Sequence, residues 1–534
     1  MPVLINNEAL VPFLSKPMHF IKGLDPLGLQ NTSEATFALL LPGLNNVTGR
    51  VRFYSFYCWL LQEYAKRSGS TDPADQRKFI RRAELIIALV NRSTEDEVAA
   101  IPGSNYANRQ LKEGYKVHDL ERGTYNEDGT TEETYWKNPG GAFGQYYLGS
   151  LMDIGLVVER ENHTTIYVRT PRTDGIAVSG EDLALAFDEN ISPKNKNLFF
   201  DCIKSGKIKS TDFDILFSEF NLSNFPSKGQ ERLLLLKLLI EKDYPQLLEE
   251  EPLIFRKQTI KHILHYSNEG NELTDRNFTV FAYFQKGLNA GVIDDCLTGW
   301  YYYQLNEYWQ YACLGVFNGT MDYLETAAGS SWKNLYQLVE EVTERTLKHL
   351  LRDEVISSKT QSMKELVAEI DGWVDETELF QYIKDETGTE RVANSFMLLL
   401  SLYKNNIDYF DRLKSFGVNN EIEKDGDGVT YYLKFEKHSS IGVNEFIRDF
   451  LLKNIIYRHQ FVAFRKMGNG TQSTQLFIIE DGLIRRLKNN FDPALTGPRI
   501  ARLIRFLSDL HILKNAELTK EGDNFLTKLS DEAA

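Results

Sequence analysis

Cysteine is scarce in this sequence. Only four occur among 534 residues, and no two of them form a Cys-x-x-Cys pair. Scattered single cysteines provide neither the spacing of a zinc site nor the framework of a disulfide-stapled domain. The sequence therefore predicts no structural metal and no disulfide network. A reducing compartment such as the cytoplasm fits this cysteine usage.

Long hydrophobic runs are also missing. The run Leu233 to Ile240 is interrupted by Lys237 and is far shorter than the ~20 residues that cross a bilayer. The first twenty residues contain no basic segment followed by an apolar core, so we expect no secretory signal. These features favour a cytoplasmic protein that makes no contact with a membrane.

The common catalytic signatures are absent as well. The glycine cluster at Gly140, Gly141 and Gly144 lacks the lysine of a P-loop. The chain contains no Glu-x-Lys, no His-Glu-x-x-His and no Gly-x-Ser-x-Gly. His262 and His265 have a His-x-x-His spacing, but two ligands alone do not define a zinc site. We therefore expect no catalytic residue, cofactor or metal ligand. Carboxylates far apart in sequence could still hold a metal, which leaves a metal-dependent nuclease with a cryptic site as an alternative.

Positive charge is outweighed by negative charge. Lys and Arg number 61 against 75 Asp and Glu, giving a formal net charge of -14. A surface of this balance does not bind nucleic acid as a whole, so phosphate contact requires a local basic patch. The hydrophobic content of 42% and charged content of 25% are typical of globular protein. At ~150 residues per domain, the length predicts three or four domains.

The C-terminal stretch from Thr496 to Ser530 contains the clearest local pattern. Apolar residues recur at helical spacing after Pro498, and Arg499, Arg502 and Arg505 fall on another face of the same expected helix. A short strand at 511–513, a turn at 514–516 and a return at 517–518 follow. Thr519 is a good N-cap for a closing helix. This order predicts a winged helix-turn-helix module.

The same order of elements is expected once more, earlier in the chain. The stretch 150–157 matches 506–513 in pattern. A hairpin with its tip at 161–163 follows, and Ser179 then begins a helix through Phe187. We therefore predict a first winged-helix module over about 142–190.

The rest of the sequence indicates a helical scaffold. The aromatic run 299–311 could stack nucleic-acid bases, but we interpret it as the packed centre of a helical domain. The stretch 429–435 predicts a strand. The predicted fold is mainly α, a helical scaffold with two winged helix-turn-helix modules and small β-hairpins. The expected segments are a helical domain at 1–100, a loop insertion and the first module at 101–190, the scaffold at 191–416, and a C-terminal region with the second module at 417–534.

Basic residues gather near the C-terminus of this acidic chain. A positive recognition helix can enter the major groove, and a wing can contact phosphates. The alternatives are that these residues pair with acids of the same chain or of a partner subunit, or that the module docks protein. The candidate DNA-binding residues are Arg465, Lys466, Arg485, Arg486, Lys488, Arg499, Arg502 and Arg505.

Two further arginines, Arg50 and Arg52, begin a predicted helix. Cations fit the positive end of a helix dipole poorly, so a carboxylate of the same chain, or a phosphate, would have to explain them. We treat them as candidate partner-binding residues.

Two blocks of the sequence resemble a known group. They are 24–28 through 40–48 and 52–59 near the start, and Tyr457 to Lys466 near the end. They are similar to uncharacterised bacterial proteins encoded in multi-gene anti-phage defence clusters, beside ATPases, helicases or nucleases. The layout also resembles kleisin-type subunits of chromosome-maintenance ATPases. The resemblance implies a non-catalytic subunit of a defence complex.

These observations lead to one main hypothesis. The chain is expected to be a cytoplasmic accessory subunit that docks a partner ATPase or nuclease and helps it contact double-stranded DNA. The alternatives are the metal-dependent nuclease and a stand-alone DNA-binding regulator.

Overall fold

The structure is a computed structural model. It describes residues 19–20, 25–94, 101–123, 134–174, 176–225, 229–240, 255–370, 375–424, 428–467, 472–487 and 491–531. The chain forms two compact units, each assembled from two stretches. We call them the α12 unit (Met1–Thr36 and Thr279–Thr496) and the α2 unit (Phe37–Phe278 and Gly497–Ala534). The fold is mainly helical with small antiparallel sheets, as the sequence predicts at this coarse level.

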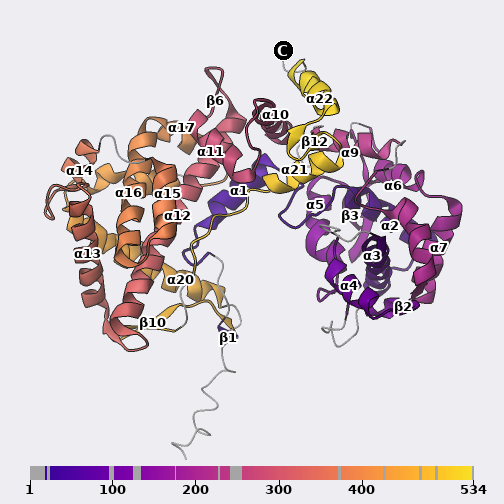
Figure 1. The fold of residues 1–534 in the computed structure, drawn as a ribbon, viewed down its shortest axis with the longest axis horizontal. Coiled ribbons are helices and arrows are strands. Elements are labelled where there is room, and N and C mark those ends of the chain that lie inside the picture. Colours follow the sequence, from indigo (N-terminus) through magenta and orange to yellow (C-terminus); the bar gives the residue numbers. More distant parts are fainter. Residues whose placement is uncertain are drawn as a thin grey trace, which may run out of the picture. The chain divides into compact units, whose positions relative to one another are not determined.

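Helices form most of both units (Figure 1). In the α2 unit they are α2 (Arg52–Arg67), α3 (Pro73–Thr94), α4 (Ser104–Lys112), α5 (Leu148–Asp153), α6 (Gly180–Asp188), α7 (Pro193–Ser205), α8 (Phe213–Phe220), α9 (Glu231–Ile240), α10 (Phe255–Asn268), α21 (Ile500–Asp509) and α22 (Lys520–Asp531). In the α12 unit they are α12 (Asp295–Ala328), α13 (Leu335–Arg352), α14 (Met363–Glu369), α15 (Glu376–Asp385), α16 (Gly388–Asn406), α17 (Phe410–Asn419), α18 (Val429–Leu433), α19 (Val443–Asp449) and α20 (Tyr457–Lys466). Two of the three unit boundaries fall within α1 (Gln30–Leu40) and α11 (Asp275–Gln285), and the third lies between Thr496 and Gly497.

The described strands are short. Antiparallel pairs join β2 (Val117–Asp119) to β5 (Lys207–Lys209), β3 (Val157–Arg160) to β4 (His163–Arg169), β6 (Leu288–Asn289) to β7 (Val292–Ile293), and β12 (Leu513–Lys514) to β13 (Glu517–Leu518). A three-stranded sheet has the order β10 (Phe477–Glu480), β11 (Leu483–Arg486), β8 (Lys333–Asn334), and β1 (His19–Phe20) pairs in parallel with β9 (Gln472–Ser473).

Helix α12 is the core of its unit. It packs against α15 and α16 (Figure 1), and its aromatic side chains from Trp300 to Tyr308 are buried. Their polar ends have partners inside the unit, since the hydroxyl of Tyr301 donates to Asn406 Oδ1 (2.7 Å) and that of Tyr303 to the Thr496 carbonyl (2.8 Å). The interpretation of this aromatic run as a packed centre is confirmed.

The predicted strand at 429–435 is wrong. The chain there forms α18, followed by a 3-10 turn at Phe435–His438. Val429, Thr430 and Leu433 are buried, and α18 lies against α16 and α17. The spacing of these buried positions matches one face of a helix, so packing overrides the β propensity of the residues.

The polar segment at 101–140, which the sequence suggested to be a loop, contains regular structure. Helix α4, strand β2 and a 3-10 turn at Leu120–Gly123 lie within it. Helix α4 contacts the long helix α3, and β2 is paired along its length with β5. Long-range packing and strand pairing therefore order a segment that has little hydrophobic periodicity of its own.

The helix, hairpin and helix expected at the C-terminus are present as α21, β12–β13 and α22. Thr519 caps α22, because its hydroxyl accepts the N–H of Gly522 at 3.0 Å. The expected start of α21 differs in detail: Pro498 precedes the helix, and Arg499 is the N-cap residue with φ of 61°. The earlier copy is present as α5, β3–β4 and α6, and Ser179 forms a capping box with Asp182. Whether these elements constitute winged-helix modules stays a prediction.

Among the described residues, no helix combines the length and the apolar composition needed to cross a membrane.

Candidate anion-binding pocket

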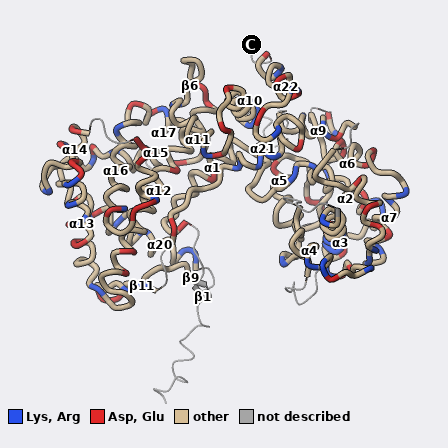
Figure 2. Tube along the Cα trace, viewed as in Figure 1, with Lys and Arg blue, Asp and Glu red and all other residues tan. Residues whose placement is uncertain are grey.

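The predicted basic residues fall in both units. Arg465, Lys466, Arg485 and Arg486 belong to the α12 unit, whereas Arg499, Arg502 and Arg505 belong to the α2 unit. Lys488 lies outside the described residues. Figure 2 shows acidic and basic residues intermixed along most helices of each unit. Whether a basic residue could bind an anion therefore depends on its contacts in the structure, and its place in the sequence does not decide this.

The four candidate basic residues that the structure describes in the α12 unit each contact their own unit. Arg486 forms an ion pair with Glu325 at 2.7 Å, and the Arg485 guanidinium lies 4.7 Å from the Trp332 ring centre. Lys466 donates to the Asp25 carbonyl at 2.6 Å. Arg465 is exposed at the end of α20, and its guanidinium lies 6.0 Å from the Phe461 ring centre of the same helix. For Arg486, pairing with an acid of the same chain is the arrangement found.

The two arginines before and at the start of α2 have carboxylate partners. Arg50 Nη1 lies 2.5 Å from Asp509 of α21. Arg52 is buried, and its Nε donates to both carboxylate oxygens of Glu231 at 3.1 and 3.2 Å. Of the two explanations that the sequence left open, a carboxylate of the same chain or a phosphate, the structure shows the carboxylate for both arginines. The N-cap of this helix is Val51, and no side-chain hydrogen bond caps the helix.

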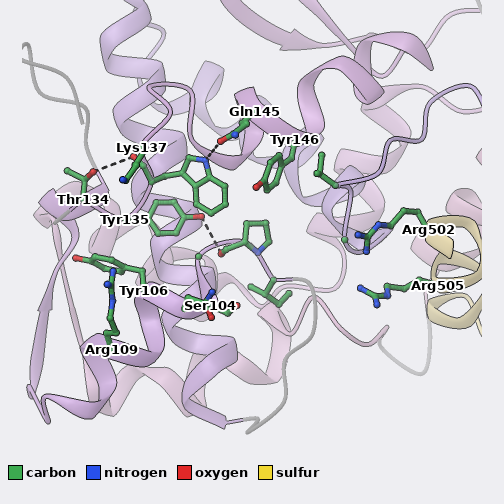
Figure 3. Close-up of a pocket in the computed structure, with 17 residues that line it drawn as sticks. Ser104, Tyr106, Arg109, Thr134, Tyr135, Lys137, Gln145, Tyr146, Arg502 and Arg505 are labelled. Atoms are coloured by element: carbon green, nitrogen blue, oxygen red, sulfur yellow. Dashed lines mark hydrogen bonds between the residues drawn. The ribbon is translucent and has the colours of Figure 1, made fainter. Parts of the chain in front are cut away.

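Arg502 and Arg505 differ from these pairs, because both line a pocket of about 680 Å³. We call it the α21 pocket. Its lining includes two further cations, Arg109 of α4 and Lys137, and none of its described residues is a carboxylate. Figure 3 shows Arg502 and Arg505 entering from one side and Arg109 and Lys137 lying on the opposite side. The lining residues are Val47, Gly49, Ile101, Pro102, Gly103, Ser104, Asn105, Tyr106, Arg109, Thr134, Tyr135, Trp136, Lys137, Gln145, Tyr146, Arg502 and Arg505.

The loop before α2 fixes helix α21 at this pocket. Asn46 accepts from Arg502 Nε through its carbonyl (2.7 Å), and its side-chain amide donates to the Gly497 carbonyl (3.1 Å). The Arg50–Asp509 ion pair holds the other end of the helix. The neighbouring Asn45 amide donates to the Tyr146 carbonyl at 2.6 Å. This short loop therefore contacts both α21 and the segment that contains Tyr146, which are two parts of the pocket lining.

The wall containing Tyr135, Trp136 and Lys137 is held from α3. Arg81 is buried and donates to three backbone carbonyls, those of Gly123, Trp136 and Asn138. One turn along α3, the Glu84 carboxylate accepts the N–H groups of Ala142 (3.0 Å) and Phe143 (2.6 Å). These bonds replace the secondary structure that the wall lacks.

Charge crowding at the pocket affects Arg505. Burial lowers the pKa of its guanidinium from the ordinary value, and the positive charges of Arg502 and Arg50 lower it further. Helix α4 also begins here with no side-chain cap, and its first residues Ser104 and Asn105 line the pocket. An uncapped helix N-terminus carries partial positive charge. The whole site therefore favours an anion.

Aromatic side chains form much of the remaining lining. The rings of Trp136 and Tyr146 meet edge to face at 5.2 Å and 90°. The indole N–H of Trp136 donates to Gln145 Oε1 at 2.7 Å, which fixes the plane of the indole (Figure 3). Tyr135 lies behind Trp136 at 5.5 Å, and its hydroxyl donates to the Pro102 carbonyl. Cations around a set of ordered rings can bind phosphate together with a flat, π-rich group.

Sequence reasoning identified Arg502 and Arg505 but missed the rest of this pocket. The sequence Tyr135-Trp136-Lys137 combines two aromatic residues and a cation within a polar segment. This combination could have indicated a binding site. It was overlooked because the segment was interpreted as a loop. Arg499, the third arginine of the expected helix face, does not line the pocket; its guanidinium lies 4.5 Å from the Phe37 ring centre.

No protein-family model, curated protein or solved structure matches this chain.

Proposed function

We propose that this protein is an accessory subunit of a bacterial anti-phage defence complex, which binds nucleic acid at the α21 pocket and docks a partner ATPase or nuclease. The observation that carries the nucleic-acid part is the lining of this pocket. Four cations line it, and no carboxylate occurs among its described lining residues, in a chain with a net charge of -14. Phosphate is the anionic group that such sites bind in nucleic acids.

The place of the arginines bears on how nucleic acid would bind. On a recognition helix that enters the major groove, base-reading side chains extend from an open face. Arg502 instead donates to the Asn46 carbonyl, and both it and Arg505 line the pocket. This arrangement favours a phosphate group that enters the pocket over a helix laid across a groove. A winged-helix role for α21, β12–β13 and α22 is compatible with either mode.

The defence-complex part is supported by the resemblance in sequence. One resembling stretch contains Asn45 and Asn46, which hold α21 and the pocket wall. Another forms α20, where Phe461 and Phe464 are 62% and 55% exposed and Tyr457 is 41% exposed. These residues are spaced at i, i+4 and i+7, which places them on one helix face. Clustered exposed aromatic residues are typical of protein-docking surfaces.

The alternative of a metal-dependent nuclease has a different requirement. Mg²⁺ prefers carboxylate oxygens as protein ligands, and the part of the α21 pocket that the structure describes offers none. The four cations of the described lining would also repel a divalent metal ion, so these residues favour an anion over the metal of such an enzyme. Incubation of the purified chain with plasmid and Mg²⁺ separates the two functions, because cleavage by this chain alone would contradict the accessory role.

Charge reversal in the pocket tests the nucleic-acid part. We expect the double variant Arg502→Glu with Arg505→Glu to bind a short labelled DNA at least tenfold more weakly at low salt. It should also reduce the salt dependence of binding by roughly one phosphate contact per arginine. Fluorescence anisotropy at several salt concentrations measures both quantities.

The matched control is Lys194→Glu with Lys207→Glu. Both lysines are exposed in the same unit, outside the pocket lining, and the net charge changes equally. Circular dichroism checks that the double variant is folded. If it is not folded, the milder variant Arg505→Gln repeats the test. Equal weakening by the pocket and control variants would show that binding follows net charge alone, and the proposal would fall.

A further inference from the structure

We propose that the α21 pocket receives one unpaired nucleotide of a single strand, with its base against Trp136 and Tyr146 and its flanking phosphates at the cations. This inference rests on the proposed function and specifies its ligand. It follows from three features: the order of cations and rings across the pocket, the rigidity of the rings, and the size of the space.

The cations lie on two sides of the aromatic residues. Arg502 and Arg505 approach from α21, and Arg109 and Lys137 lie across the pocket with the rings between them (Figure 3). In a nucleic-acid strand, every internal nucleotide has a phosphate on each side of its sugar and base. A strand crossing the pocket would therefore bring phosphates to both groups of cations and a base to the rings. A lone phosphate ion would use only one side.

The aromatic residues are ordered before any ligand binds. The Trp136 indole is held by Gln145, and Arg81 donates to the Trp136 carbonyl at 2.8 Å. Gly103 permits close packing behind this wall, because its φ is +81° and a Cβ there would lie 1.9 Å from Tyr135 Cε2. Preordered rings lose little conformational entropy when a base stacks on them. The wall is thus suited to bind a planar group as well as a charge.

A base within a duplex does not fit this arrangement. Its faces are covered by neighbouring bases and its edge is paired, so it reaches an aromatic wall only after leaving the stack. The pocket volume of about 680 Å³ falls in the range of ~300–1,000 Å³ found for sites of small ligands. It suits one nucleotide. Duplex DNA would contact the rim cations alone.

The experiment compares ligands that separate phosphate from base. The full-length chain is titrated by anisotropy with a short single strand, the same sequence as a duplex, and an abasic strand that retains the phosphates. Unlabelled mononucleotide serves as competitor to test whether a free nucleotide binds equally. We expect the single strand to bind at least fivefold more tightly than either the duplex or the abasic strand, since stacking of one base changes affinity roughly fivefold to hundredfold.

Two substitutions test whether the base binds within the pocket. Trp136→Leu and Tyr146→Leu should each lower single-strand affinity toward that of the abasic strand and leave abasic binding unchanged. The control Trp332→Leu makes the same change at a partly exposed tryptophan of the other unit and should have no effect. Photo-cross-linking with a bromouracil-containing strand should label Trp136 or Tyr146.

The outcomes separate this inference from the proposed function. Equal binding of single strand, duplex and abasic strand, all weakened by Arg502→Glu with Arg505→Glu, would overturn the inference and keep the proposed function. A single-strand preference that survives both aromatic substitutions would also overturn it, because the base would lie elsewhere. No binding of any of these ligands would overturn both.

Discussion

Replacement of Arg52 by alanine should destabilise the α2 unit strongly. The Arg52 and Glu231 side chains are 2% and 1% exposed, and two hydrogen bonds join them. Arg52 also donates to the carbonyls of Asn221 and Asn224, and its guanidinium lies 5.1 Å from the Phe187 ring centre. The change would leave a buried carboxylate without its charged partner and would remove two hydrogen bonds from Arg52 to backbone carbonyls. Loss of one member of a buried ion pair costs about 3–5 kcal/mol.

Calorimetry of the full-length chain measures this effect. For a unit of this size, a loss of about 3–5 kcal/mol lowers the transition temperature by roughly 5–9 °C. Lys453→Ala is the surface control, because Lys453 and Asp449 form an ion pair with side chains 68% and 45% exposed; it should cost about 0.5 kcal/mol or less. Arg52→Met with Glu231→Met removes both charges and should recover a large part of the loss.

The refuting result is equally specific. If Arg52→Ala and Lys453→Ala shift the transition equally, the buried pair contributes no more than a surface pair, and the structural explanation of Arg52 is wrong. If Arg52→Ala leaves stability unchanged but abolishes copurification with a partner subunit, Arg52 binds the partner, as the sequence alone suggested. The stability and copurification of one variant therefore decide between the two roles.

Two further predictions concern Glu84, which holds the pocket wall, and Ser179, which caps α6. Burial raises the pKa of Glu84 to about 7, above its usual value near 4.3. The folded protein therefore binds the Glu84 proton more tightly than the unfolded chain does. This contribution to the free energy of unfolding is fully present below about pH 4.5 and is lost as the pH rises through about 7. Glu84→Gln removes this titration, and its stability relative to the natural protein should increase by up to about 3 kcal/mol between about pH 5 and about pH 8 in urea unfolding; parallel pH profiles of the two proteins would contradict this. Ser179→Ala removes the capping box with Asp182, in which the Ser179 hydroxyl accepts the Asp182 N–H at 3.1 Å, and should cost about 1 kcal/mol. The exposed Ser218→Ala is its control, and an equal cost for both changes would mean that the cap adds nothing.

Several elements could be predicted because their sequence pattern determines their packing. The apolar spacing from Ile500 to Leu507 predicted α21, and Thr519 and Ser179 marked two helix starts that the structure confirms. The stretch 429–435 failed because β-branched and aromatic residues also suit a buried helix face, and contacts with α16 and α17 determine the outcome. Periodicity thus identifies an element where one face is apolar, and long-range packing decides where the pattern fits both structures.

The α21 pocket could be predicted only in part, for a physical reason. Arg502 and Arg505 belong to a periodic helix, whereas Trp136 and Lys137 belong to a segment whose shape is set from outside it. That segment is held by Arg81 through carbonyls at Gly123, Trp136 and Asn138, which are 42 to 57 positions away along the chain. A buried guanidinium that binds backbone carbonyls places no constraint on the side chains of the segment it holds. Such a wall therefore has no hydrophobic period, so periodicity in the sequence could not reveal Trp136 and Lys137 as part of the pocket lining.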